Sequence, residues 1–245
     1  MTLAIVVNSC VSFSPTTMPI FLDSMRLARI PLSNVYCILG ESDVDSIDTS
    51  NEYTVIKTRF CNVDNTAAVY LTQTDHGRSI LNAYTHIFYT HDTVRFLEGF
   101  WTTIQTYLPS CSSYRKLQES ATKTTGLLHS QWFLREKSKV MKYLANTDID
   151  KRYAYKSSIG IPNEADIRAN CSHLPQWLNE DVIFDFKDDF GATGDWFVKN
   201  ADVPTHFEDI YGTGTVRKAY VYNPPGIIKY QKNFVIVDNN WQMNL

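Results

Sequence analysis

The residues with the clearest chemical potential stand at the end of one apolar segment. Residues 84–94 read Tyr-Thr-His-Ile-Phe-Tyr-Thr-His-Asp-Thr-Val, a pattern typical of a buried strand that runs directly into a carboxylate, Asp92. In open α/β sheets, ligands bind beyond the carboxyl ends of the strands. Asp92 is therefore expected to meet a divalent metal or a phosphate-bearing ligand. The competing interpretation is an ordinary solvated turn after a strand.

A second candidate site lies near the carboxyl end of the chain. Residues 211–218 read Tyr-Gly-Thr-Gly-Thr-Val-Arg-Lys. Two glycines allow a backbone to approach a phosphate closely, and Arg217 and Lys218 would supply positive charge beside it. The segment is not a P-loop, and a flexible hairpin loop with solvated basic residues is the alternative.

The elements that must position Asp92 follow the order of an α/β sheet. Strand, helix and strand with short connections predict a right-handed parallel crossover unit. Four strands in this order make half of a doubly wound sheet. Residues 67–71 fit either a further strand or a short helix. The expected strands are 3–7, 35–39, 53–57 and the segment that ends at Asp92, and the expected helices are 15–30 and 76–83.

Residues 96–245 continue with a mixture of helices and strands. An acidic, glycine-bearing segment at 185–196 is expected to form an active-site loop or a helix start. The polar stretch 111–125 is expected to be a loop. The expected helices are 96–108 and 127–144, and the expected strands are 152–161, 218–222 and 227–230. Together these patterns predict an α/β fold with a mostly parallel central sheet flanked by helices, and with a carboxyl-terminal segment beside it.

The region before Asp92 resembles the nucleotide-sugar half of GT-A-type glycosyltransferases. In that family a glycine-led helix, a strand and an Asp-x-Asp element follow one another. Here Gly77, Arg78 and Asn82 lie in the helical segment, and the element reads His91-Asp92-Thr93, with His91 in place of the family's first Asp. The resemblance is clearest over residues 1–95. The glycine loop at 211–218, followed by a basic strand and a lysine-bearing strand, also resembles the carboxyl end of some predicted glycosyltransferases of large DNA viruses, of the chlorovirus kind, and of microbes.

This resemblance implies a single GT-A-like, Rossmann-like domain over residues 1–245. Residues 1–95 would bind the nucleotide sugar, and residues 96–245 would form the acceptor side. The implied activity is transfer of a sugar from a nucleotide-diphosphate donor, most simply a UDP-sugar, to a hydroxyl of a glycan. Asp92 would bridge the diphosphate through Mn²⁺ or Mg²⁺, with His91 and Thr93 shaping the shell, and imidazole with carboxylate suits manganese at least as well as magnesium.

Donor-binding residues are carried over from the family by position. Asn8, Ser9 and Glu41 stand where the fold contacts uracil and ribose, and Asn and Ser side chains match the hydrogen-bonding edges of a base. Asn8 and Ser9 could equally form a strand-ending cap. Arg78 stands where the fold contacts the diphosphate, and an arginine can fork onto phosphate. Arg217 is the second expected phosphate contact.

The resemblance also implies a late metal ligand and a general base. His206 could be the ligand that many members contribute from the carboxyl-terminal segment, although a lone histidine near a loop is more often solvated. Transfer with inversion needs a carboxylate that takes the proton of the acceptor hydroxyl. Asp189 is the first choice for this base, with Asp188 and Asp195 as alternatives, and each could instead cap a helix or face water.

Composition narrows the classes of partner. The chain has 245 residues, a net charge of −3 and a pI near 6.1, which argue against a protein held to nucleic acid by a broad basic face. The amino terminus has neither the basic region of a signal peptide nor a membrane span, so a cytoplasmic protein is expected. Five cysteines without a Cys-x-x-Cys pair indicate neither a disulfide framework nor a zinc cage.

Two other functions fit the same patterns. A sugar-phosphate nucleotidyltransferase also uses a parallel sheet, a metal and a carboxylate, but it usually carries a glycine-rich basic signature after the first strand. Residues 11–14 read Val-Ser-Phe-Ser and lack that signature. A non-catalytic carbohydrate-binding protein would use the aromatic residues for stacking on sugar, with the acidic turns at the surface.

Overall fold

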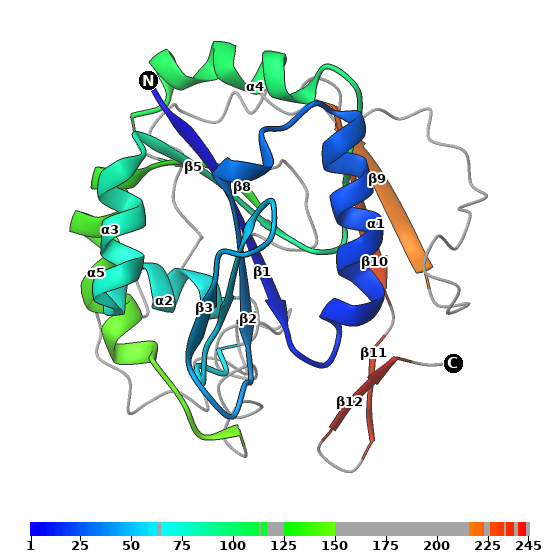
Figure 1. Ribbon diagram of the computed structural model, residues 1–245, viewed down its shortest axis with the longest axis vertical. Helices are drawn as coiled ribbons and strands as arrows, with labels where there is room; N and C mark the ends of the chain where they lie inside the picture. Colours follow the sequence, from blue (N-terminus) through cyan, green and yellow to red (C-terminus); the bar gives the residue numbers. More distant parts are fainter. Residues whose placement is uncertain are drawn as a thin grey trace, which may run out of the picture.

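The protein is described here by a computed structural model that covers residues 1–62, 65–112, 114–116, 125–149, 216–222, 226–232, 234–237 and 240–243. Its centre is a mixed sheet of seven strands with helices on both faces, which confirms the expected α/β class (Figure 1). In spatial order the strands are β3 (Ser46–Asp48), β4 (Thr54–Lys57), β2 (Val35–Gly40), β1 (Leu3–Cys10), β5 (His86–His91), β8 (Gly126–His129) and β7 (Tyr114–Lys116).

The four central strands of this sheet are parallel. Strand β1 pairs with β2 on one side and β5 on the other, and β2 pairs with β4. The chain steps outward from β1 through β2 to β4, and then returns to the other side of β1 to form β5. This reversal is a topological switch point, the place where open α/β sheets bind ligands beyond the carboxyl ends of the strands. Asn8 of β1 lies opposite His91 of β5 at this edge.

Five helices in the described part of the chain cover the two faces. Helices α1 (Ser14–Leu27) and α4 (Phe100–Tyr107) contribute to one core cluster, and helices α2 (Thr66–Gln73), α3 (Asp75–Ala83) and α5 (Ser130–Leu144) contribute to the other. Figure 1 shows α3 and α5 on one side of the sheet and α1 on the opposite side. Short 3₁₀ helices, η1 (Leu32–Asn34) and η3 (Leu108–Ser110), precede β2 and follow α4. No helix among the described residues is long and apolar enough to cross a membrane.

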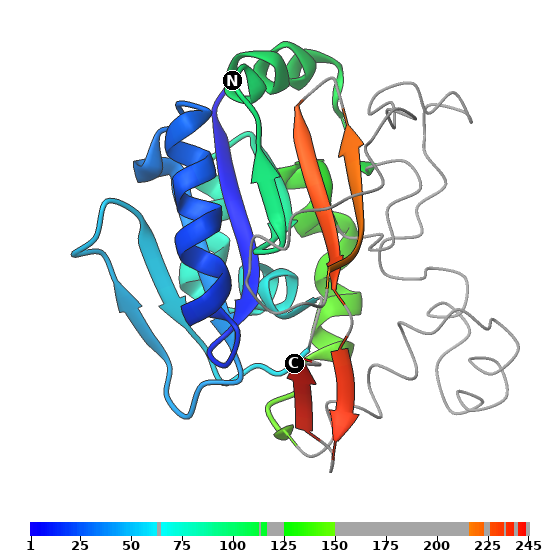
Figure 2. The same cartoon turned by 90° about the vertical axis from the view of Figure 1, so that its right-hand side faces the viewer.

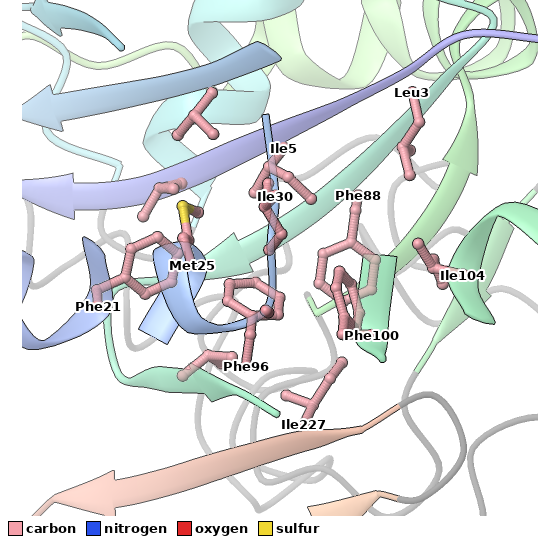
Figure 3. Packing of buried hydrophobic residues seen from close by; sticks show 14 of the residues in the cluster. Leu3, Ile5, Phe21, Met25, Ile30, Phe88, Phe96, Phe100, Ile104 and Ile227 are labelled. Carbon is pink, nitrogen blue, oxygen red and sulfur yellow. The ribbon is translucent and has the colours of Figure 1, made fainter. Parts of the chain in front are cut away.

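Strand β1 sorts its side chains strictly between the two faces. Leu3, Ile5 and Val7 lie in the cluster with helix α1, and Ala4 and Val6 lie in the cluster with helix α2. Successive side chains of a strand point to opposite faces, so an uninterrupted apolar run such as residues 3–7 is what a sheet covered on both faces requires. Figure 3 shows Leu3 and Ile5 in the first cluster, together with Phe21, Met25, Phe88 and Phe100.

A smaller antiparallel sheet joins the carboxyl-terminal part of the chain to the residues that follow Asp92. Strand β6 (Val94–Phe96) pairs with β10 (Ile227–Lys232), which pairs with β9 (Val216–Tyr222). Figure 2 shows β9 and β10 side by side. Ile227 is fully buried in the cluster with helix α1, so β10 is anchored to the main core. Strands β11 (Phe234–Val237) and β12 (Asn240–Met243) form a separate hairpin.

Several expected boundaries are wrong, and in each case a strand pairing decides the structure. The helix expected over 96–108 begins only at Phe100, because Val94–Phe96 pairs with β10 and Gly99 takes a left-handed conformation, φ +85°. The helix expected over 127–144 begins at Ser130, since the four residues before it form β8 against β5. The stretch 111–125, expected to be a loop, contains strand β7, which pairs with β8. Residues 67–71 are helical, within α2, which is one of the two expected alternatives. The expected elements at 152–161 and 185–196 lie outside the described residues.

A buried histidine predicts a pH dependence of stability. His86 is 2% exposed, its Nε2 lies 2.8 Å from the carbonyl oxygen of Cys111, and burial lowers its pKa below the usual 6.5. The unfolded chain therefore binds the proton first, and the contribution of His86 to stability is lost as the pH falls from about 6.5 through the lower folded-state pKa. We expect the free energy of unfolding, measured with urea, to decrease from pH 7.5 to pH 5. His86→Gln should show a smaller decrease, and equal slopes would contradict this.

Candidate functional site

Three parallel strands end together at the switch point and carry most of the expected donor-binding residues. Asn8 and Ser9 lie in the last three residues of β1, Gly40 ends β2 and is followed by Glu41, and His91 ends β5 and is followed by Asp92. Strand β1 is paired with both β2 and β5 as far as these positions. The residues expected to bind the donor on the three strands are therefore neighbours at one edge of the sheet. The structure thus brings together residues that are separated by up to 84 positions in the sequence (92 − 8 = 84).

Asp92 is held in one orientation by two hydroxyl groups. The Oγ of Ser9 donates a hydrogen bond to Oδ2 of Asp92 at 2.5 Å, and the hydroxyl of Thr17 on helix α1 donates to the same oxygen. Asp92 is buried, at 8% exposure, so it is not a solvated turn residue. The carboxylate therefore links the end of β1, helix α1 and the turn after β5.

A buried lysine provides positive charge beside this carboxylate. Lys229 of β10 is 3% exposed, and its Nζ donates a hydrogen bond to Oγ1 of Thr93 at 2.6 Å. Burial raises the pKa of Asp92 above its ordinary value, while the hydroxyls of Ser9 and Thr17 and the charge of Lys229 oppose that rise. The turn after β5 therefore holds groups of both charges: the carboxylate of Asp92 and, hydrogen-bonded to the adjacent Thr93, the ammonium group of Lys229.

Asn8 and Ser9 face opposite sides of the sheet. The Oδ1 of Asn8 accepts hydrogen bonds from the backbone N–H of Ala67 at 2.8 Å and from the hydroxyl of Tyr89 at 3.2 Å, so it holds the start of helix α2. Ser9 instead contacts Asp92 on the side of helix α1. Because neighbouring residues of a strand alternate between faces, the two side chains do not converge on one nucleobase edge as expected.

The described residues do not fit a metal held at the turn after β5. His91 lies on the opposite face from Asp92, with its ring 6.2 Å from that of Tyr89. The hydroxyl of Thr93 accepts a hydrogen bond from the ammonium of Lys229, a cation that would repel a divalent metal. In the part of the chain that is described, no three His, Cys, Asp or Glu side chains gather in a way that could hold a metal ion. In an Asp-x-Asp element the first Asp lies two residues before the second. If Asp92 is the second, the first position is therefore Thr90 and not His91, and Thr90 is fully buried.

The end of β2 is shaped by a close approach of helix α2. A Cβ added to Gly40 would lie 2.7 Å from Cγ2 of Thr66 and 2.8 Å from the carbonyl oxygen of Phe60. Glu41 follows in the left-handed region, φ +61°, and its N–H donates to the same carbonyl at 2.9 Å. Burial and the carboxylates of Glu41 and Asp92 raise the pKa of the Cys10 thiol to about 11, so this thiol stays protonated near neutral pH. Glu41 thus lies at the same edge of the sheet, as expected.

Arg78 does not reach this edge. Its guanidinium donates to the carbonyl oxygen of Thr72 at 3.0 Å and forms an ion pair with Asp75 at 2.6 Å. Thr72 is at the carboxyl-terminal end of helix α2, whereas the start of that helix contacts Asn8. A cation near the last carbonyls of a helix is a common stabilising arrangement. Arg78 is therefore a capping residue of α2, and the expected contact with a diphosphate is not supported.

The remaining expected site residues fall beyond what the structure describes. Asp188, Asp189, Asp195 and His206 lie outside the described residues, and so do residues 211–215 of the glycine loop, whereas residues 216–218 begin β9. Arg217 lies in β9, but its side chain is likewise outside the described set.

Two residues of the site carried only weak sequence signals. Thr17 looks like an ordinary residue in the first half of a helix, and nothing local marks its contact with Asp92. Lys229 stands two residues after the buried Ile227 in a strand, and residues two apart share a face. A lysine at an inward-facing strand position is unusual. Its spacing of two residues from Ile227 was therefore the signal in the sequence that could have identified Lys229.

Comparison of the sequence with known protein families and with curated proteins gave no match. The site is therefore interpreted from its own residues: a carboxylate, three hydroxyls and a buried ammonium group at the switch point between parallel strands.

Proposed function

We propose that this protein is a GT-A-like glycosyltransferase that moves a sugar from a nucleotide-diphosphate donor, most simply a UDP-sugar, to a hydroxyl of a glycan. The observation that carries the proposal is the convergence of Ser9, Glu41 and the Asp92–Thr93 turn at the switch point of the sheet. Nucleotides bind at such points in open α/β folds.

The arrangement of the second sheet supports the same proposal. Strand β6 follows Asp92 after a turn and pairs with β10, so the carboxyl-terminal part of the chain returns to the end of β5. Residues of both halves then meet beside the expected position of the donor, as Lys229 and Thr93 do. A donor half and a carboxyl-terminal half that share one site suit an enzyme with two substrates.

The proposed chemistry is substitution at the anomeric carbon of the donor sugar. The acceptor oxygen forms a bond to this carbon, and the bond between the carbon and the diphosphate oxygen breaks. The bonding electrons leave with the diphosphate, and the proton of the acceptor hydroxyl passes to a carboxylate. Positive charge near the departing diphosphate lowers the barrier, because negative charge grows there in the transition state. Among the acidic residues, Asp189 remains the base expected from the sequence.

The proposal is tested by identifying the product released from nucleotide sugars. The purified chain is incubated with a panel of UDP-, GDP- and CMP-sugars and glycan acceptors, and the released nucleotide is analysed by chromatography. We expect release of the nucleoside diphosphate with at least one donor, and faster release when an acceptor is present. Thermal shift with the free nucleotides should show stabilisation by the matching diphosphate, because ligands that bind only the folded state stabilise it.

Other outcomes separate the alternatives. Release of pyrophosphate from a nucleoside triphosphate and a sugar phosphate would identify a nucleotidyltransferase. Binding of glycans without binding of any nucleotide would identify a carbohydrate-binding protein. Either result would exclude sugar transfer from a nucleotide donor.

A further inference from the structure

The turn after β5 contains a cation where the sequence predicted a metal. The Nζ of Lys229 lies 2.6 Å from Oγ1 of Thr93, one of the expected metal ligands, and its charge also acts on Asp92. Lys229 comes from β10, which is held in place by pairing with both β6 and β9. The ammonium group is therefore fixed beside the carboxyl edge by strand pairing, more than 130 residues from its partner in the sequence (229 − 93 = 136).

Burial of this lysine is not explained by packing alone. A charged group that is 3% exposed is unfavourable unless charge or hydrogen bonds compensate it. An apolar residue at the same inward position would extend the core that Ile227 already joins. The presence of Lys229 there, with Asp92 as the nearby opposite charge, indicates a role for the positive charge itself.

We propose that the ammonium group of Lys229 binds the diphosphate of the donor at the Asp92–Thr93 turn, in place of a divalent metal ion, so that donor binding and sugar transfer need no metal. This inference rests on the proposed function. A lysine ammonium is a compact point charge that binds phosphate well. It would stabilise the diphosphate as the anomeric bond breaks and the leaving oxygen takes the electron pair, the role that a metal plays in other phosphate-leaving reactions.

Asp92 then has a different role from the one that the sequence indicated. Its Oδ2 is bound by the hydroxyls of Ser9 and Thr17, and its negative charge lies beside the ammonium group of Lys229. A carboxylate engaged in this way is a positioning group for Lys229 and does not contact the donor through a metal. The same contacts fix the turn on which Thr93 lies.

The test compares nucleotide binding with and without metal. Isothermal titration with UDP is performed on the whole chain in EDTA and again with Mn²⁺. The inference predicts the same affinity within about twofold in both conditions. In EDTA, Lys229→Met should weaken UDP binding at least tenfold and leave the affinity for uridine unchanged, because uridine lacks the diphosphate. Methionine retains most of the length of lysine and removes both the charge and the hydrogen bond to Thr93.

Lys142→Met is the matched control. Lys142 is an exposed lysine on helix α5, on the opposite face of the sheet, and its replacement should leave UDP binding unchanged. UDP binding to the wild type only with Mn²⁺ would overturn the inference and leave the proposed function standing. Equal UDP affinities of the wild type and Lys229→Met would also overturn it. If neither condition gives binding of UDP or of another nucleoside diphosphate, the proposed function fails, and this inference fails with it.

Discussion

Replacing Asp92 with alanine is expected to lower the rate of sugar transfer by at least a hundredfold and to destabilise the protein by about 2 kcal/mol. The hydroxyls of Ser9 and Thr17 lose their shared acceptor, and each hydrogen bond to a charged group contributes about 1.5–3 kcal/mol. Relief of the desolvation of the buried carboxylate, which raises its pKa in the folded protein, offsets part of that loss. Initial rates and urea unfolding measure the two effects.

Asp92→Asn separates charge from hydrogen bonding. The amide oxygen of asparagine can accept from both hydroxyls, so the free energy of unfolding should fall by less than in Asp92→Ala. Transfer should still be strongly reduced, because the ammonium of Lys229 has lost its negative neighbour. Full activity of Asp92→Ala in a stably folded protein would contradict the role of this carboxylate.

Replacing Gly77 with alanine is expected to destabilise the protein by about 3 kcal/mol. An added Cβ would lie 2.2 Å from the carbonyl oxygen of Tyr70 and 2.6 Å from Cα of Leu71, both of them backbone atoms of helix α2. Backbone atoms cannot move aside as a side chain can, so helices α2 and α3 would have to separate. The gain of helix propensity from glycine to alanine, about 1 kcal/mol, is smaller than this clash. Urea or thermal unfolding measures the change.

Gly99→Ala is the matched control for this prediction. No atom lies within 4 Å of a Cβ added at Gly99, but its φ of +85° is unfavourable for alanine. The expected loss is about 1 kcal/mol, from the backbone conformation alone. If Gly77→Ala were no more destabilising than Gly99→Ala, the close contact of α2 with α3 would not determine the choice of glycine at position 77.

Gly77 also shows how one residue supports two interpretations. In the sequence, a glycine that opens a helix before an acidic turn indicated a donor-binding element. In the structure, the N–H of Gly77 donates to Oγ1 of Thr74, which caps helix α3, and the missing side chain leaves room for the backbone of helix α2. Arg78 beside it caps the end of α2. Packing between two helices explains both residues.

The sequence by itself determined the α/β class and the edge of the sheet where the site lies. An apolar run such as residues 3–7 of β1 is typical of a sheet covered on both faces, and polar residues that follow such a run lie toward the carboxyl edge. These features depend on local patterns of two to eight residues. The ends of β2 at Gly40 and of β5 at His91 were therefore predictable, and so was the position of Asp92 after β5, whereas β1 continues through Asn8 and Ser9 to Cys10.

Only the tertiary structure decided which of these side chains meet. Alternation along β1 sends Asn8 to helix α2 and Ser9 to Asp92, and the same alternation separates His91 from Asp92. The short strands β6 and β8 were missed because three or four residues carry little local pattern, and these strands are defined by their pairing with β10 and β5. Lys229 reaches Thr93 through the pairing of β10 with β6, a contact between distant segments that no local pattern contains. Long-range strand pairing thus placed a lysine where the local sequence had indicated a metal.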